Sequence, residues 1–123
     1  MEEEAELTEL LAQIDKLKKS GKLVLVEGIK DKNSLAELGI TNVLVLKKAL
    51  FAVAEQVSET AKECVILTDF DKEGKELYGR LKNHLEKVGV KIDDEFRNFL
   101  IRNTHVTHVE GLSSYIEHLQ EKQ

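Results

Sequence analysis

Two stretches of the sequence decide the fold: LVLVEG at residues 23–28 and CVILTDFDKEG at residues 64–74. Each begins with a short apolar run rich in strand-forming side chains and then changes abruptly to acidic residues and glycine. Apolar runs of this kind predict strands that are buried on both faces, as in a parallel sheet covered by helices on either side. Ligands bind such sheets beyond the carboxyl ends of the strands, which is where these acidic residues lie.

The rest of the sequence alternates between helical and strand patterns. Further strand signals lie at residues 43–46 and, as a fourth strand at the sheet edge, at residues 106–109. Apolar residues at helical spacing predict helices that include residues 6–19, 35–38, 50–57, 77–88, 96–100 and 112–119, with Asp93 as the cap of the fifth. The alternation predicts an α/β fold with a mostly parallel four-stranded sheet and helices on both faces.

The length and composition are those of one globular domain. The chain has 123 residues, of which 41% are apolar and 33% charged, enough for one core. We therefore expect residues 1–123 to form a single domain. Its expected parts are an N-terminal amphipathic helix (1–20), a motif-bearing core (22–92) and a C-terminal strand and helix part (93–123).

Several classes of protein are excluded by composition. No apolar stretch reaches the roughly 18 residues of a membrane span, and the acidic start MEEEAEL is unlike a signal peptide. The one cysteine, Cys64, lies in an apolar run, which predicts a buried thiol and, with the other features, a cytoplasmic protein. Motifs for a phosphate loop, a dinucleotide fold and a serine nucleophile elbow are all missing.

The net charge of −5 argues against binding nucleic acid through bulk electrostatics, which requires excess lysine and arginine. Contact with nucleic acid must then be local or mediated by a metal ion. Six lysines gather early in the chain, and we interpret most of them as a solvated helix face: Lys16, Lys18, Lys19, Lys22, Lys30 and Lys32.

Acidic residues follow the first and third predicted strands. If these strands are neighbours, Glu27, Asp69 and Asp71 converge on one edge of the sheet, with Glu73 as a further candidate. Such a concentration of negative charge repels itself unless a cation is present. Oxygen ligands with no nearby thiol or imidazole favour Mg²⁺, or Mn²⁺, over zinc. The alternative is that these acids only cap helices.

The two stretches together resemble the Toprim signature, in which a strand, Glu and Gly are followed later by a strand and Asp-x-Asp-x-x-Gly. The resemblance extends over LVLVEGIKDKNSL and CVILTDFDKEGKEL, and covers roughly residues 22–92. The family includes type IA and type II topoisomerases, bacterial primases, OLD-family nucleases and a ribonuclease that matures ribosomal RNA. The resemblance implies a Rossmann-like, three-layer Toprim fold.

The resemblance also implies roles for individual residues. Glu27 would act as general acid or base, Asp69 and Asp71 would hold Mg²⁺, and Glu73 would be a further ligand of the metal or its water. Glu27 would contribute to the same metal site. Other expected participants are Gly28, Asp31 and Gly74 as supporting residues, and Lys30 and Lys72 as phosphate contacts.

Two functions are compatible with these residues. The first is Mg²⁺-dependent phosphodiester chemistry on RNA or DNA, as a nuclease or nucleotidyl transferase. The second is a non-catalytic module that binds metal and nucleic acid within a larger RNA-processing, replication or repair complex. Strand passage of the topoisomerase kind is excluded by size, and the zinc module of primases is missing from the sequence.

Overall fold

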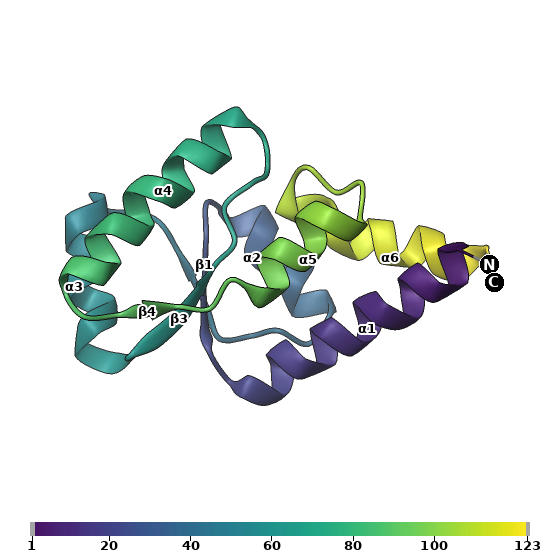
Figure 1. Ribbon diagram of the computed structural model, residues 1–123, viewed down its shortest axis with the longest axis horizontal. Coiled ribbons are helices and arrows are strands. Elements are labelled where there is room, and N and C mark those ends of the chain that lie inside the picture. The colour runs from purple at the N-terminus through teal and green to yellow at the C-terminus, as the bar shows by residue number, and fades with distance from the viewer. Residues whose placement is uncertain (1, 123) are drawn as a thin grey trace.

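From Glu2 to Lys87 the elements follow one another in the alternating order that the apolar pattern predicts (Figure 1). The computed structural model describes residues 2–122. Its elements are α1 (Glu2–Ser20), β1 (Leu23–Val26), α2 (Ile29–Glu37), β2 (Val43–Val45), α3 (Leu50–Thr60), β3 (Glu63–Ile66), α4 (Lys72–Lys87), β4 (Lys91–Ile92), α5 (Glu95–Asn103), the 3-10 turn η1 (Val109–Gly111) and α6 (Leu112–Glu121). Among residues 2–122, none of the helices combines the length and apolar character that a membrane crossing requires.

The four strands form one parallel sheet in the order β2-β1-β3-β4. Strand β1 is central, so Leu25 pairs with Leu44 of β2 on one side and with Ile66 of β3 on the other. The pairing continues past the end of β3, where the Leu67 N–H donates to the Leu25 carbonyl at 2.8 Å. The carboxyl ends of β1 and β3 are therefore side by side, as predicted.

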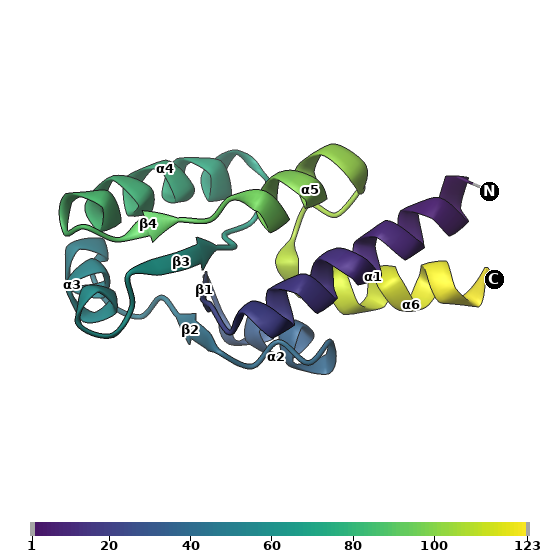
Figure 2. The same ribbon diagram turned by 60° about the horizontal axis from the view of Figure 1, so that its bottom comes forward.

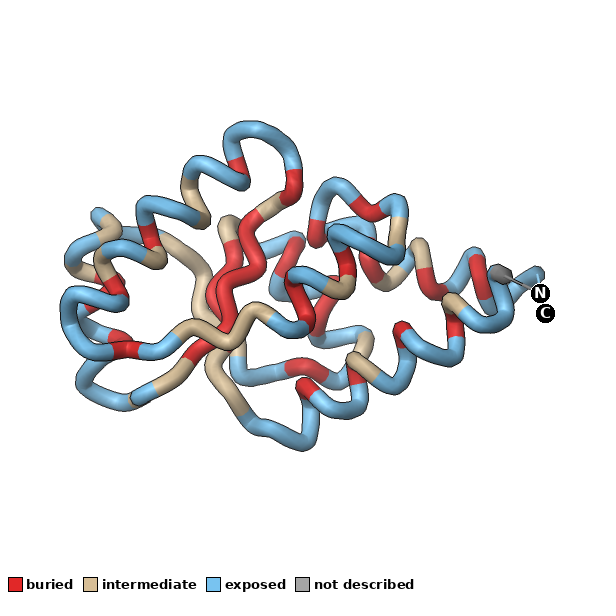
Figure 3. The backbone as a smooth tube through the Cα atoms, viewed as in Figure 1, coloured by how far each residue is buried: buried red, intermediate tan, exposed pale blue. Residues whose placement is uncertain are grey.

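Helices cover both faces of the sheet, which confirms the predicted α/β architecture of three layers (Figure 2). Successive residues of β1 serve opposite faces, because strand side chains alternate. Val24 and Val26 pack with α1, α2, α5 and α6, whereas Leu25 packs with α3 and α4. Figure 3 shows burial concentrated in the central strands and exposure along the outer sides of the helices.

The predicted N-terminal helix is confirmed and begins earlier, at Glu2. Its apolar residues Leu7, Leu10, Ile14 and Leu17 are buried in the core layer that contains α5 and α6. Burying one leucine side chain stabilises a fold by about 1.5–3 kcal/mol, so this stripe attaches α1 firmly. The predicted thiol burial is also confirmed: Cys64 is fully buried, and desolvation raises its pKa to about 12.

The lysines near the N-terminus form ion pairs at the surface. Lys16 Nζ lies 2.8 Å from Glu95, and Lys22 Nζ lies 2.7 Å from Asp93. The ion pair between Lys19 and Asp15, also at 2.8 Å, joins neighbouring turns of α1. Lys16 and Lys19 lie on the exposed face of α1, as interpreted, whereas Lys22 follows the end of α1 and its side chain is only 29% exposed.

The prediction of a fourth strand at residues 106–109 is wrong, and with it the strand expected in residues 93–123. Strand β4 is instead Lys91–Ile92, which pairs with β3. Strand β4 takes the place beside β3, and residues 106–109 are not part of the four-stranded sheet. They run alongside the chain after β3, where the Phe70 N–H donates to the Thr107 carbonyl at 2.9 Å. The helix predicted near residues 96–100 is confirmed as α5. Its N-cap is Asp94, one residue later than predicted, although the Asp93 side chain accepts a hydrogen bond from the Glu95 N–H at 3.0 Å.

The turn from β3 into α4 requires glycine at position 74. A Cβ atom there would lie 2.0 Å from the backbone oxygen of Asp69, which is far inside van der Waals contact. Two hydrogen bonds close the same turn: the Gly74 N–H donates to Asp71 Oδ1 at 2.8 Å, and the Thr68 hydroxyl donates to the Gly74 carbonyl at 2.7 Å. Residues 67–71, called here the β3 exit loop, are thus pinned against the start of α4.

We predict that Gly74→Ala destabilises the protein, because the clash is with backbone and no side-chain rotation relieves it. The free energy of unfolding should fall by about 2–3 kcal/mol. Gly79→Ala in the same helix is the matched control: a Cβ there meets nothing within 4 Å. Since alanine is the better helix former, this variant should gain up to about 1 kcal/mol. Urea unfolding followed by circular dichroism measures both, and equal stabilities would contradict the required close approach.

Candidate metal centre

Glu27 joins the ends of β1 and β3. It is the first residue after β1, and its Oε2 accepts a hydrogen bond from the backbone N–H of Asp69 at 2.8 Å. The Asp69 N–H lies beyond the last backbone hydrogen bond between β1 and β3, so it needs another acceptor. The carboxylate of Glu27, at the end of the neighbouring strand, provides it. The structure thereby brings the first and second acidic stretches into direct contact.

Asp69 and Asp71 are each oriented by a backbone donor. Asp69 Oδ1 accepts from the Val109 N–H at 2.9 Å, and Asp71 Oδ1 accepts from the Gly74 N–H at 2.8 Å. Asp71 is therefore the N-cap of α4, as the alternative interpretation of the acids predicts. Each bond uses one carboxylate oxygen and keeps the side chain in place, so capping and cation binding are compatible roles.

A histidine that the sequence interpretation left out faces these carboxylates. His108 Nε2 lies 3.3 Å from Asp71 Oδ2. Asp69, Asp71 and His108 each offer one ligand atom, and these atoms lie within 4.8 Å of one another. The expectation that no imidazole is near the acids is therefore wrong. The sequence gives no sign of this approach, because it depends on how residues 106–109 dock.

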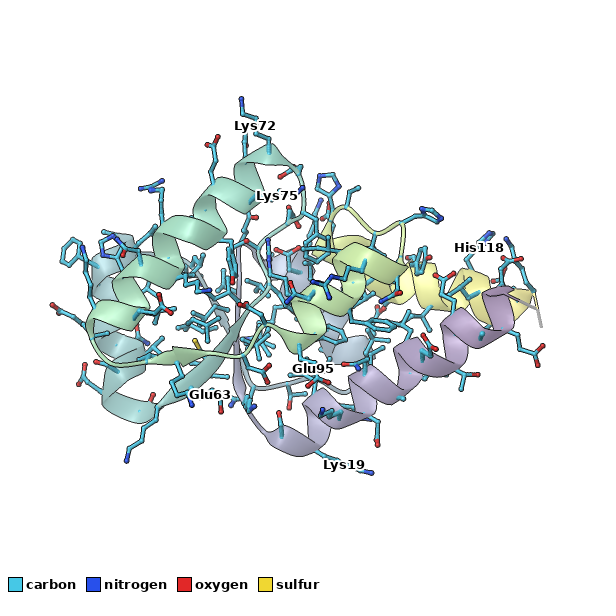
Figure 4. The ribbon with its side chains drawn as sticks, in the orientation of Figure 1. Lys19, Glu63, Lys72, Lys75, Glu95 and His118 are labelled. Atoms are coloured by element: carbon cyan, nitrogen blue, oxygen red, sulfur yellow. The ribbon has the colours of Figure 1, made fainter. Side chains whose placement is uncertain are left out.

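The other predicted participants lie around this group. The Glu27 carboxylate contacts the backbone N–H of Asp69, and Glu73 is exposed in the first turn of α4. Neither residue belongs to the group formed by Asp69, Asp71 and His108. Lys72 is exposed and points away from the body of the protein at the start of α4 (Figure 4). Lys30 is exposed in the first turn of α2 and lines an open polar groove toward α6.

Asp31 supports the turn after β1. Its Oδ2 accepts from the Gly28 N–H at 2.9 Å, and the side chain is buried at 6% exposure. Desolvation raises the pKa of the Asp31 carboxyl, the bond from Gly28 opposes that shift, and the charges of Asp69, Glu27 and Glu110 raise it further. Burial of Asp31 is thus the main cause of its raised pKa, and the neighbouring carboxylates add to it.

Arg97 holds the β3 exit loop in place from the core side, through hydrogen bonds to backbone carbonyls. This role was not predicted from the sequence. Arg97 is buried at 3% exposure and donates to the carbonyls of Thr68 at 2.7 Å and, at longer range, of Asp69 at 3.3 Å and Ile66 at 3.4 Å. Its guanidinium carbon lies 4.4 Å from the ring centre of Tyr78. Burial lowers the pKa of Arg97, and nearby negative groups oppose that shift.

The donor set fits a divalent cation. Two carboxylates and an imidazole converge on one point, and two of them are preoriented by backbone N–H groups. The helices α2 and α4 both begin at this edge, so the positive ends of their dipoles offset part of the acidic charge. A divalent cation bound here would offset the remaining charge.

Comparison with known proteins gives the family. A model of the Toprim domain matches residues 22–111, which include both acidic stretches and His108. The chain belongs to the Toprim domain family. This Toprim chain is similar to a UPF0292 protein of Methanosarcina barkeri, with 33% identity over 94% of this chain and 84% of the relative.

Two further relatives extend the comparison. A UPF0292 protein of Pyrococcus abyssi is 38% identical over 72% of this chain and 68% of its own length. A solved structure of a protein from Aquifex aeolicus superposes with a TM-score of 0.75 and 31% identity, covering 80% of this chain and 94% of that one. The Toprim fold expected from the two stretches is thus confirmed, and membership of this family points to a metal-binding, nucleic-acid-related function.

We predict that Arg97→Met destabilises the protein by about 2–4 kcal/mol, because it strips three buried carbonyls of their donor. Arg97→Lys should lose less, since it keeps the charge but not the planar fork. Arg102→Met, at an exposed position of the same helix, is the matched control and should change stability by less than about 0.5 kcal/mol. Chemical unfolding measures all three; a wild-type value for Arg97→Met would refute the role of this residue.

Proposed function

We propose that this Toprim protein carries out Mg²⁺-dependent phosphodiester chemistry on RNA or DNA, as a nuclease or nucleotidyl transferase. The observation that supports this most is the junction of Glu27 with Asp69, beside the cluster that Asp69 forms with Asp71. A proton-transferring group next to cation ligands is what phosphoryl transfer asks of a protein, which mainly positions groups and neutralises charge.

Asp69 and Asp71 are the proposed ligands of the ion. A bound Mg²⁺ would neutralise charge that builds up on the phosphate oxygens during the reaction. Backbone N–H groups fix both side chains, so little reorganisation is needed when an ion enters. Glu73, in the first turn of α4, is a proposed further ligand of the ion or its water.

Glu27 is the proposed general acid or base. Its Oε2 is occupied by the Asp69 N–H, which holds the carboxylate still at the end of β1. The second oxygen of the carboxylate is then the one to exchange a proton with an attacking or leaving hydroxyl. Half-burial of Glu27 limits, without preventing, its contact with solvent.

Substrate would be held locally, because the chain carries a net charge of −5. Lys30 and Lys72 lie in the first turns of α2 and α4, shortly after the acids that end β1 and β3. The N-termini of these helices also attract phosphate. Both lysines are exposed, so they are free to reach a phosphodiester backbone at this edge of the sheet. The ion and these two lysines together would supply the positive charge that the rest of the surface lacks.

We predict that Glu27→Gln and Asp69→Asn each lower turnover at least about 100-fold, which is the usual contribution of general acid–base groups. Both amides can still accept the backbone hydrogen bonds, so the fold should persist. Asp69→Asn should also weaken Mg²⁺ binding, whereas Glu27→Gln should largely retain it. Labelled single-stranded, duplex and structured RNA and DNA, with Mg²⁺ or Mn²⁺, provide the assay, and calorimetry gives the affinity.

The matched control is Asp15→Asn, an exposed acid of α1 whose partner is Lys19. It should behave as wild type in both measurements. Full activity of Asp69→Asn, or no cutting or extension of any substrate, contradicts the enzymatic proposal. Tight metal binding without turnover would instead favour the non-catalytic module acting inside a larger complex.

A further inference from the structure

Residues 107–109 are docked across the β3 exit loop. The Phe70 N–H donates to the Thr107 carbonyl at 2.9 Å, and the Val109 N–H donates to Asp69 Oδ1, also at 2.9 Å. Val109 is fully buried and anchors the segment in the core. His108 lies between these two anchored residues, so its backbone position is set on both sides while its side chain stays half-exposed beside Asp71.

The contact with the neighbouring threonine is compatible with the metal-binding tautomer of the imidazole, in which Nδ1 carries the hydrogen. Thr107 Oγ1 lies 3.0 Å from His108 Nδ1. When the Nδ1–H donates to this hydroxyl, Nε2 carries the lone pair, and Nε2 is the atom that faces Asp71 Oδ2. Metal-ligating histidines in proteins typically use their second nitrogen in this way, to fix tautomer and ring orientation.

The spacing is that of neighbouring ligands on one ion. Carboxylate oxygens and imidazole nitrogens lie about 2.0–2.2 Å from a small divalent cation, so adjacent ligands of an octahedral site are about 3 Å apart. His108 Nε2 and Asp71 Oδ2 are 3.3 Å apart, and the ligand atoms of the full group are within 4.8 Å of one another. Small side-chain movements would complete the coordination.

We propose that His108 is a direct ligand of the cation, together with Asp69 and Asp71, and that this set binds Mn²⁺ in preference to Mg²⁺. An imidazole replaces one of the oxygen ligands that Mg²⁺ prefers, and Mg²⁺ also dehydrates reluctantly and demands near-ideal geometry, so this mixed set should cost Mg²⁺ more than Mn²⁺. The inference rests on the cation site of the proposed function and adds its selectivity. At equal concentrations of the two ions, Mn²⁺ would then be the one that is bound.

The competing role for His108 is a protonated partner of Asp71. In that case the imidazolium would occupy the place of the cation, and removing it would strengthen metal binding. His108→Ala should therefore weaken Mn²⁺ binding if His108 is a ligand of the ion. It should strengthen Mn²⁺ binding if His108 is instead the partner of Asp71. His105 is a matched control, because it is an exposed histidine of the same loop whose backbone N–H contacts the Tyr115 hydroxyl at 3.4 Å.

The test is pulsed electron paramagnetic resonance on the full chain with one equivalent of Mn²⁺. Wild type and His105→Ala should show the ¹⁴N coupling of a directly bound imidazole, and His108→Ala should lose it. Calorimetric titration should show Mn²⁺ affinity at least about tenfold weaker in His108→Ala. Mg²⁺ affinity should change much less, so the preference for Mn²⁺ should shrink.

Failure takes distinguishable forms. Mn²⁺ that binds wild type without ¹⁴N coupling, or binds His108→Ala more tightly, overturns the ligand role of His108 and leaves the carboxylate site standing. A wild-type protein that binds neither Mn²⁺ nor Mg²⁺ removes the cation site itself, and with it the proposed function. A wild-type spectrum without ¹⁴N coupling overturns the ligand role even if a variant folds poorly.

Discussion

The hydrogen bond from the Asp69 N–H to Glu27 Oε2 is the constraint on which the rest of the site depends. It exists only because β1 and β3 are parallel neighbours, whose carboxyl ends meet at one edge of the sheet. A hydrogen bond to a charged group contributes about 1.5–3 kcal/mol, enough to fix the course of the chain after β3. From that fixed point Asp71 caps α4, Gly74 packs against the Asp69 carbonyl, and the acids share one edge.

Gathering carboxylates in this way costs electrostatic free energy. The fold offsets part of that cost with backbone dipoles and with the buried guanidinium of Arg97. Backbone N–H groups orient Asp69 and Asp71. Arg97 brings a positive charge to the core side of the β3 exit loop, where it donates to the backbone carbonyl of Thr68. Asp31 adds a further buried carboxyl whose pKa burial raises. Because the protein's own groups compensate only part of this charge, a divalent cation is the natural remaining partner, which is also what the Toprim family match leads one to expect.

Sequence alone predicts the central elements because their signals are local. The run LVLV and the run CVIL are long enough to show β-branched, doubly buried strands, and the parallel rule then brings Glu27 to Asp69. Strand β4 has only two residues, Lys91 and Ile92, too few to carry a pattern, so the more apolar residues 106–109 took its place in the prediction. Arg97 and His108 were missed for another reason. Their roles arise from tertiary contacts with the β3 exit loop, and neither side chain has a local pattern that reports such contacts.

The central claim is that Asp69 and Asp71, the acids after β3, hold a cation beside Glu27, and anomalous diffraction from crystals soaked in Mn²⁺ tests it most directly. A single strong peak should lie about 2.2 Å from carboxylate oxygens of both Asp69 and Asp71, with Glu27 still bonded to the Asp69 N–H. Crystals that bind Mn²⁺ elsewhere and show no peak between these carboxylates would contradict the claim.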